Sequence, residues 1–108
     1  MSAPVVLNAD NFDARVRQAA GPVVVDFWSQ TCPHCLALAP QFEAAAQADA
    51  TGATFATLRL QDAPALFAPH NVSGVPTLIL FKGGQEVARR VGYAGTQQIT
   101  EWVKEKVG

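Results

Sequence analysis

Two cysteines, Cys32 and Cys35, are the residues best suited to chemistry in this chain of 108 residues. They are its only cysteines, and they lie three positions apart. A disulfide between them would close a very short loop and add little stability, because the stabilising effect of a crosslink grows with loop length. A secreted scaffold would space its cysteines more widely. We therefore interpret the pair as a redox centre rather than a structural crosslink.

A buried strand followed by a helix is expected to hold the two cysteines in place. Residues 23–28 are apolar except for Asp26, and such a β-branched run is typical of a strand buried on both faces. Residues 29–31 form a turn, and residues 32–49 carry apolar side chains at helical spacing. Pro40 lies inside this predicted helix and is expected to kink it. The cysteine pair therefore lies where a helix begins.

The start of a helix suits the chemistry of a reactive thiol. Cys32 is expected at the helix N-terminus, where unpaired backbone amides and the helix dipole favour a thiolate. Pro33 fits the first turn because it lacks an N–H that would find no partner there. Cys35 lies one turn further along, so we expect it to be more buried and to act as the resolving thiol.

The remaining segments predict an α/β fold with a single domain over residues 1–108. The patterns indicate strands at residues 5–7, 53–60, 77–81 and 86–91, and helices at residues 8–20, 63–68 and 96–107. Asp10 and Thr96 are the predicted N-caps of the first and last helices, and Gly21-Pro22 ends the first. The resulting order, β-α-β-α-β-α-β-β-α, predicts a mixed central β-sheet with helices on both faces.

Six motifs follow one another along the chain. They are Val25-Asp26-Phe27-Trp28, Cys32-x-x-Cys35, Pro40, Gly74-Val75-Pro76-Thr77, Phe81-Lys82-x-Gly84 and Val91-Gly92. Their order and spacing resemble the thioredoxin family over nearly the whole chain, with no insertion. The predicted order of strands and helices is also that of the thioredoxin fold.

This resemblance implies an enzyme that exchanges disulfides with protein substrates and needs no metal or organic cofactor. The Cys32 thiolate attacks a substrate disulfide and forms a mixed disulfide, and Cys35 then attacks Cys32 and releases the reduced substrate. The expected electron donor is a thioredoxin reductase, which would link the chain to electron transport and cell redox homeostasis. We also expect a monomer.

The resemblance further implies a cis-proline and a substrate-binding surface. Pro76 matches the family's cis-proline, which lies beside the cysteines in space. The residues expected around the exposed sulfur are Trp28, Thr31, Gly74, Val75, Gly92, Tyr93 and Ala94. Such a flat and weakly charged patch suits varied protein disulfides.

Asp26 is the carboxylate that the resemblance and its apolar strand single out. Burial should raise its pKa, because a charged carboxyl is costly in an apolar setting. We interpret it as a general base that helps to deprotonate Cys35; the alternative is a buried Asp with a structural role only. The family often has Lys where this chain has Thr57, so Asp26 should be neutral more readily. Arg59, on the same strand face, is expected to be solvated rather than to replace that Lys.

The residues around the cysteines depart from the usual family pattern. The pair Pro33-His34 resembles the active site of periplasmic disulfide-forming oxidoreductases, which carry a large helical insertion that this chain lacks. His34 can donate a hydrogen bond or positive charge toward the Cys32 thiolate, whereas Leu36 removes a cation that the family usually has. We expect His34 to dominate and predict a potential between about −270 mV for thioredoxin and about −120 mV for the strongest oxidant of the superfamily.

Composition excludes several classes of function. Hydrophobic residues make up 49% and charged residues 16% of the chain, which is enough apolar material for a core. The formal net charge of −1 gives no indication of nucleic-acid or membrane-surface binding. The first residues lack the features of a secretory signal, and no apolar run reaches transmembrane length, so a cytoplasmic location is the expectation.

Three alternatives stay open at the level of sequence. A structural zinc site would need four ligands, and neither a second CxxC nor a His pair accompanies the cysteines, since His70 is distant. A non-catalytic interaction module could use the same fold. A glutathione-linked oxidoreductase such as glutaredoxin is the third, although the spacing from Trp28 to Cys32 favours thioredoxin.

Overall fold

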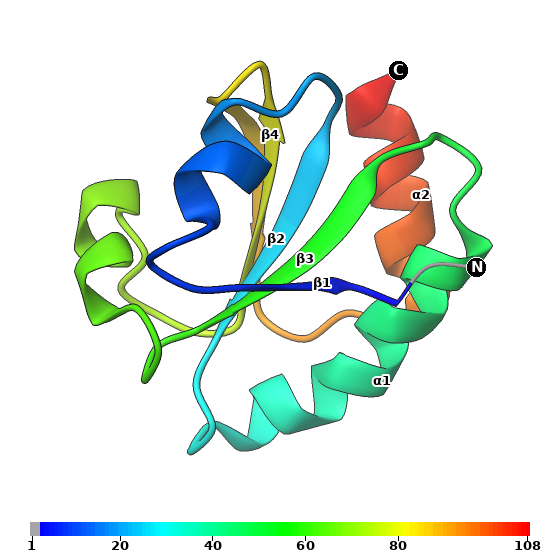
Figure 1. The fold of residues 1–108 in the computed structure, drawn as a ribbon. Helices are drawn as coiled ribbons and strands as arrows, with labels where there is room; N and C mark the ends of the chain where they lie inside the picture. Colours follow the sequence, from blue (N-terminus) through cyan, green and yellow to red (C-terminus); the bar gives the residue numbers. More distant parts are fainter. Residues whose placement is uncertain (1–2) are drawn as a thin grey trace.

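A five-stranded mixed sheet forms the centre of the computed structural model, which describes residues 3–108 (Figure 1). Its strands are β1 (Val5–Leu7), β2 (Val23–Trp28), β3 (Thr54–Arg59), β4 (Thr77–Lys82) and β5 (Gln85–Val91). They lie in the order β1-β3-β2-β4-β5. Strands β1, β3 and β2 run parallel to one another, and β4 and β5 run antiparallel to the strands beside them. The prediction of an α/β fold with a mixed sheet is confirmed.

The two faces of the sheet are covered by different kinds of helix. The α-helices α1 (Pro33–Ala48) and α2 (Thr96–Val107) cover one face. The other face carries a π-helical turn, η1 (Asp13–Arg17), and two 3₁₀ turns, η2 (Pro64–Leu66) and η3 (Ala68–His70) (Figure 1). The sheet therefore separates two hydrophobic cores.

Alternation along β2 explains why this strand is apolar on both sides. Val23, Val25 and Phe27 point into the core beneath the short turns, whereas Val24 points into the core beneath α1 and α2. All four side chains are at most 1% exposed. A strand buried on both faces between parallel and antiparallel neighbours needs such a continuous apolar run.

The predicted helix over residues 8–20 is wrong in its extent. The side chain of Asn8 accepts hydrogen bonds from the backbone N–H groups of Asp10 and Asn11 at 2.8 and 3.0 Å, so these residues form a turn. Asp10 is therefore not the N-cap, and helical structure is limited to the π-helical turn η1. Phe12 and Val16 within this segment are nonetheless buried, each at 1% exposure.

Close packing of a turn against η1 requires glycine at one position. Gly84 lies in the turn between β4 and β5 with φ of +79°, and a Cβ there would stand 2.6 Å from the carbonyl oxygen of Arg17. No larger residue fits this approach, and the left-handed backbone also favours glycine.

Two further helix predictions need correction. In place of one helix over residues 63–68, two 3₁₀ turns span residues 64–66 and 68–70, because Pro69 cannot donate the hydrogen bond that would continue an α-helix. The N-cap of α2 is Gly95 and not Thr96. The Thr96 hydroxyl instead donates to Oε1 of Gln41 at 2.7 Å, which ties the start of α2 to α1.

Candidate active site

Cys32 is the N-cap residue of α1 and lies just beyond the end of β2. Its Sγ accepts a hydrogen bond from the backbone N–H of Cys35 at 3.1 Å, as a capping side chain does. Pro33 occupies the first turn, where its missing N–H leaves no unmet bond. The predicted position of the cysteine pair at the start of a helix is confirmed.

The two thiols differ in their access to solvent. Both are free thiols in this structure; Cys32 is partly exposed, whereas Cys35 is buried at 1% exposure. Burial raises the pKa of the Cys35 thiol well above its usual range, and the hydrogen bond with Cys32 acts in the same direction. The backbone of Ser29 opposes this shift, and the nearby charge of Asp26 adds to it. The exposed sulfur is therefore that of Cys32.

The loop before β4 brings a proline against the reactive sulfur. The Val75–Pro76 peptide bond is cis. The Sγ of Cys32 contacts the carbonyl oxygen of Val75 at 3.6 Å, and the backbone N–H of Gly92 donates to the carbonyl oxygen of Pro76 at 2.8 Å. Three segments that are distant in the sequence thus meet at Cys32.

Most residues that we expected around the sulfur have accessible surface, with one exception. Thr31, Gly74 and Tyr93 are exposed, and Trp28, Val75 and Gly92 are partly buried. Ala94 is fully buried in the core beneath α2, so its predicted place on the surface is wrong. Two apolar side chains that we did not include in this surface are also exposed: Val91, which precedes Gly92, and Leu36, which follows Cys35, are 66% and 54% exposed.

Asp26 is a buried carboxyl that forms no ion pair with any of the described residues, 3–108. It is 2% exposed, and within residues 3–108 its Oδ1 has no hydrogen-bond partner. Burial alone raises its pKa to about 7. Its neighbours across the sheet are Thr57 on β3 and Leu78 on β4. The predicted upward shift of this pKa is confirmed.

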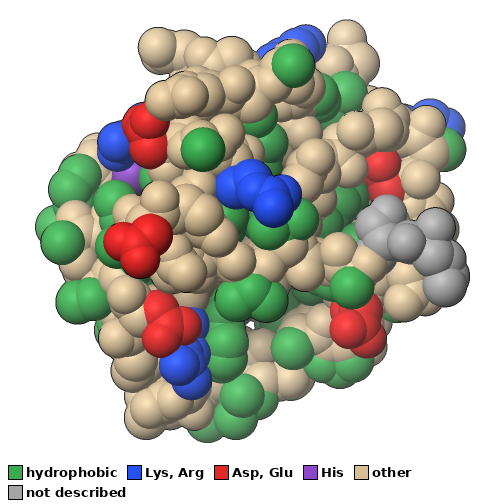
Figure 2. Space-filling view, viewed as in Figure 1, with side chains coloured by type: hydrophobic (Ala, Val, Ile, Leu, Met, Phe, Trp, Pro, Cys, Tyr) green, Lys and Arg blue, Asp and Glu red, His purple; other side chains and the backbone are tan. Residues whose placement is uncertain are grey.

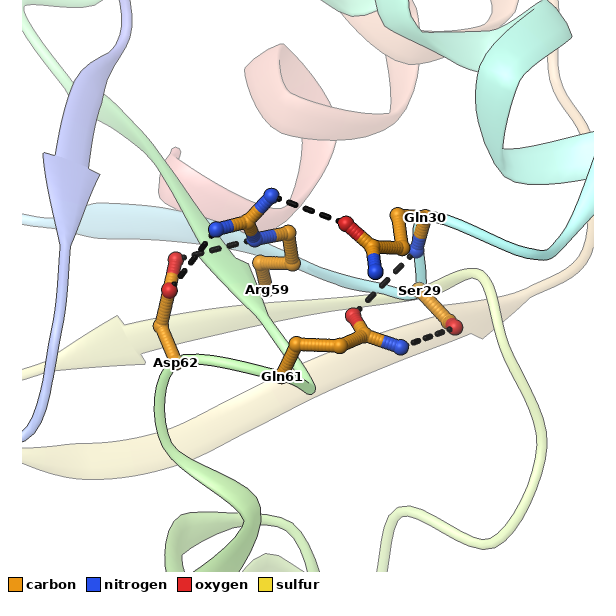
Figure 3. A network of polar contacts seen from close by, with 5 residues as sticks. All are labelled: Ser29, Gln30, Arg59, Gln61 and Asp62. Atoms are coloured by element: carbon orange, nitrogen blue, oxygen red, sulfur yellow. Dashed lines mark hydrogen bonds and ion pairs between the residues drawn. The ribbon is translucent and has the colours of Figure 1, made fainter.

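Arg59 does not take the place of the missing lysine. Its guanidinium donates to both carboxyl oxygens of Asp62 at 2.8 and 3.0 Å and to Oε1 of Gln30 at 3.0 Å (Figure 3). The side chain is thus engaged at the end of β3, near the segment that precedes Cys32.

A polar network behind the cysteines was missed in the sequence analysis. Gln61 donates to Oγ of Ser29 at 3.0 Å and accepts from the backbone N–H of Gln30 at 3.3 Å (Figure 3). The Ser29 oxygen also accepts from the backbone N–H of Thr31 at 3.3 Å. The available signal was that the parallel strands β2 and β3 end at the same edge of the sheet, which brings the residues after them together. The network holds the turn that leads into Cys32.

His34 lies in the first turn of α1, next to the proline that follows Cys32. Its side chain is exposed, and within residues 3–108 it makes no hydrogen bond to Cys32. Of the two effects predicted for His34, the hydrogen bond is not seen and the effect of its charge stays a prediction.

The described residues hold neither a candidate metal cluster nor a helix that could span a membrane. Within residues 3–108, no three His, Cys, Asp or Glu side chains come together as a candidate metal site. In the same range, neither α-helix has the length and apolar character to span a membrane.

The fold and the paired cysteines together define a class of protein. An exposed thiol at a helix start, a buried thiol one turn away and an adjacent proline on a mixed sheet are the parts of a thiol–disulfide oxidoreductase.

Comparison with known proteins identifies the family within this class. The family model described as Thioredoxin matches residues 3–105. The chain is 35% identical over 97 residues to Thioredoxin of Rhodospirillum rubrum, covering 90% of this chain and 93% of that protein. It is 37% identical over 97 residues to Thioredoxin of Alicyclobacillus acidocaldarius subsp. acidocaldarius, covering 90% and 91% respectively. Thioredoxin C-2 of Corynebacterium nephridii is 32% identical over 108 residues, covering 99% of this chain and 100% of that protein.

The chain belongs to the thioredoxin family. It is a thiol–disulfide oxidoreductase with a redox-active pair spaced as CxxC, and the predicted family, fold class and type of enzyme are confirmed. Thioredoxins act on protein disulfides and are typically reduced by thioredoxin reductase.

Proposed function

We propose that Cys32 is the nucleophile and Cys35 the resolving thiol in exchange with protein disulfides. The observation that carries this assignment is the contrast between the partly exposed Cys32 and the buried Cys35, whose backbone N–H donates to the Cys32 sulfur. The Cys32 thiolate attacks one sulfur of the substrate disulfide and expels the other as a thiolate. Cys35, once deprotonated, attacks Cys32, expels the second substrate thiolate and leaves an intramolecular disulfide. The substrate gains the two electrons that the cysteine pair loses.

Asp26 is proposed as the base that takes the proton of Cys35, directly or through water. Its pKa of about 7 lies near the working pH, which suits a general base. The charge of Asp26 raises the pKa of the Cys35 thiol, which is the effect expected of a carboxylate that takes up the proton of this thiol. Thr57 brings no charge to the carboxyl, which therefore carries its proton more readily than one paired with a lysine.

The enzyme is proposed to be more oxidising than ordinary thioredoxin. A stabilised Cys32 thiolate makes the reduced form more favourable and the disulfide a stronger oxidant. The backbone N–H of Cys35 stabilises this thiolate, and the first turn of α1 contains no acidic residue that would oppose it. His34 is the side chain of this turn that can carry positive charge, while Leu36 supplies none.

The substrate-binding surface is proposed to surround the Cys32 sulfur. Val75 contacts this sulfur, and Gly92 is bonded to Pro76 next to it. Thr31, Gly74, Trp28 and Tyr93 complete the proposed surface. We propose a monomeric single domain over residues 1–108 that works in the cytoplasm with a thioredoxin reductase; a cysteine pair suited to chemistry rather than crosslinking fits a reducing compartment.

Reduction of insulin tests this function directly. Purified protein should accelerate the reduction of insulin by dithiothreitol, and a thioredoxin reductase with NADPH should replace dithiothreitol. Cys35→Ser should abolish turnover, and Asp26→Ala should slow it. Equal insulin reduction with and without the protein would make it a non-catalytic module, whereas activity with glutathione but not with the reductase would make it glutathione-linked.

The direction of exchange is tested by the redox potential. Equilibration with glutathione buffers, followed by thiol trapping and mass spectrometry, gives the fraction of oxidised cysteine pair. We expect a potential above the value of about −270 mV that is typical of thioredoxin. A potential at or below that value would contradict the proposed oxidising character.

A further inference from the structure

A recess opens between the edge strand β1 and helix α1, away from the Cys32 sulfur. Its volume is about 330 Å³, and its walls include the apolar side chains of Pro4, Val6, Ala39 and Phe42. Figure 2 shows this face hollowed below β1, with apolar side chains around the hollow. Val6 is 71% exposed, so its side chain has much apolar surface left to bury. Sites for small organic ligands have volumes upward of about 300 Å³ and mainly apolar walls, and this recess falls at the small end of that range.

The buried carboxyl of Asp26 lines this recess. Its Oδ1 has no hydrogen-bond partner within residues 3–108, although the side chain is only 2% exposed. A buried carboxyl without a partner is costly, and a ligand that donates a hydrogen bond to the accessible remainder of this carboxyl would reduce that cost. Thr57 also lines the recess, and its short side chain leaves room over the carboxyl.

The charges of the recess have a single sign. Among the described residues that line it, Asp26 and Glu43 are the only charged side chains, and both are acidic. The cation nearest along β3, Arg59, is held by Asp62 and Gln30 instead. The partly buried Trp28 adds an aromatic ring, which attracts cations through its face.

We propose that this recess is a binding site for a small primary ammonium with a compact apolar body, held by the carboxyl of Asp26. The ammonium group supplies the positive charge and the N–H donors that the described part of the chain does not bring to this carboxyl. The apolar body covers the exposed surface of Val6 at the wall of the recess. Glu43 attracts the cation to the mouth of the recess.

Binding of an ammonium should compete with protonation of the carboxyl. The groups that face Asp26 are Thr57 of β3, Leu78 of β4, and Cys35 and Glu43 of α1. Arg90 lies one strand beyond Leu78. Because the pKa of Asp26 is about 7, the carboxylate predominates above that pH and is lost below it. A primary amine keeps its proton throughout this range, so binding should weaken roughly tenfold between about pH 8 and about pH 6.

Benzylamine is the probe for this site, and benzyl alcohol is its uncharged match. Binding is measured by NMR titration of the full chain with both cysteines kept reduced. We expect saturable shifts at residues that line the recess with a Kd of about 1 mM at about pH 8. Benzyl alcohol should give no saturable shifts. Absence of saturation by benzylamine, or equal binding of the alcohol, overturns the proposal.

Two substitutions test which groups hold the ligand. Asp26→Asn removes the charge while keeping the shape, and Thr57→Lys places a protein ammonium beside the carboxyl. Each should weaken benzylamine binding at least about tenfold, as expected when a buried charged partner is lost. Thr54→Lys, on the same strand but the opposite face, is the matched control and should leave the affinity unchanged. Unchanged binding by Asp26→Asn overturns the assignment of the carboxyl. The titration involves no turnover, so its outcome is independent of the proposed exchange reaction.

Discussion

The backbone N–H of Cys35 donates a hydrogen bond to the sulfur of Cys32 at 3.1 Å, so the resolving residue also stabilises the nucleophile. Since the donor belongs to the backbone, Cys35→Ser keeps this bond while it removes the resolving thiol. We expect the variant to accumulate a stable mixed disulfide with substrate, detectable by mass spectrometry. Its steady-state rate of insulin reduction should fall at least about a hundredfold.

Cys32→Ser is the matched control for this trapping experiment. It keeps the buried thiol of Cys35 but removes the accessible one, so it should form no mixed disulfide. Equal trapping by the two variants would show that Cys35 reaches substrates itself, which would contradict the assigned order of attack.

Stability should depend on pH through Asp26. Burial raises the folded-state pKa of this carboxyl from 3.8 to about 7, whereas the unfolded chain ionises it near the ordinary value. Below about pH 4 the carboxyl is protonated in both states, so its burial does not lower the stability. As the pH rises to about 7, the carboxyl ionises in the unfolded chain but not in the folded one, and the free energy of unfolding falls. At pH values above 7, this shift of the pKa corresponds to a loss of about 4 kcal/mol in the free energy of unfolding, relative to low pH. Urea denaturation of the wild type and of Asp26→Asn between about pH 4 and about pH 8 measures this difference.

The expected result is a steep loss of stability with rising pH in the wild type and a much flatter profile in Asp26→Asn. Glu43→Gln removes a neighbouring carboxylate that is exposed, and it serves as the control for a change in net charge. Parallel pH profiles for the wild type and Asp26→Asn would mean that Asp26 is not the group responsible.

The sheet and both α-helices were predictable because their sequence patterns are strong. The run 23–28 has no polar residue other than Asp26, so it could only be a central strand. The first helix failed because its pattern is weak: the Asn8 side chain captures backbone N–H groups, and the chain turns instead of continuing as a helix. The prediction of Thr96 as an N-cap was wrong for a related reason. Its hydroxyl donates to Gln41 on α1, a contact that no local sequence pattern reveals.

In the candidate site, too, features set by the local sequence were predictable, whereas contacts between distant segments were not. The places of Cys32, Pro33 and Cys35 were predictable because an apolar strand precedes them and a helical pattern follows them in the sequence. The bond from Gln61 to Ser29 spans 32 positions and exists only because two parallel strands end side by side. Pro76 was found through a family motif, since nothing in its immediate neighbours indicates that it meets Cys32.

Gln61 should fix the turn that precedes the nucleophile. Gln61→Ala removes its bonds to Ser29 and to the backbone of Gln30, and we expect a loss of about 1 kcal/mol of stability because the site is partly solvated. Amide hydrogen exchange at Gln30 should become faster, because its N–H loses its partner. Gln47→Ala on the exposed surface of α1 is the control. Equal exchange rates at Gln30 in both variants would refute a role for Gln61 in holding this turn.

The charge near the start of α1 should set the redox potential. His34 and Leu36 are both exposed in the first turn, so changing either leaves the core intact. His34→Ala removes a source of positive charge near the Cys32 thiolate and should lower the potential by about 15 to 30 mV. Leu36→Lys adds a cation and should raise it by a similar amount, about 15 to 30 mV. Both are measured by equilibration with glutathione.

Salt dependence separates charge from other effects in these two variants. Exposed charges are screened as ionic strength rises, so the differences in potential should shrink between about 0.05 and about 1 M salt. A shift that persists at high salt would indicate altered packing at Cys32 rather than electrostatics. A rise in potential on His34→Ala would contradict the role of this residue, because it would mean that the imidazole favours the disulfide over the thiolate.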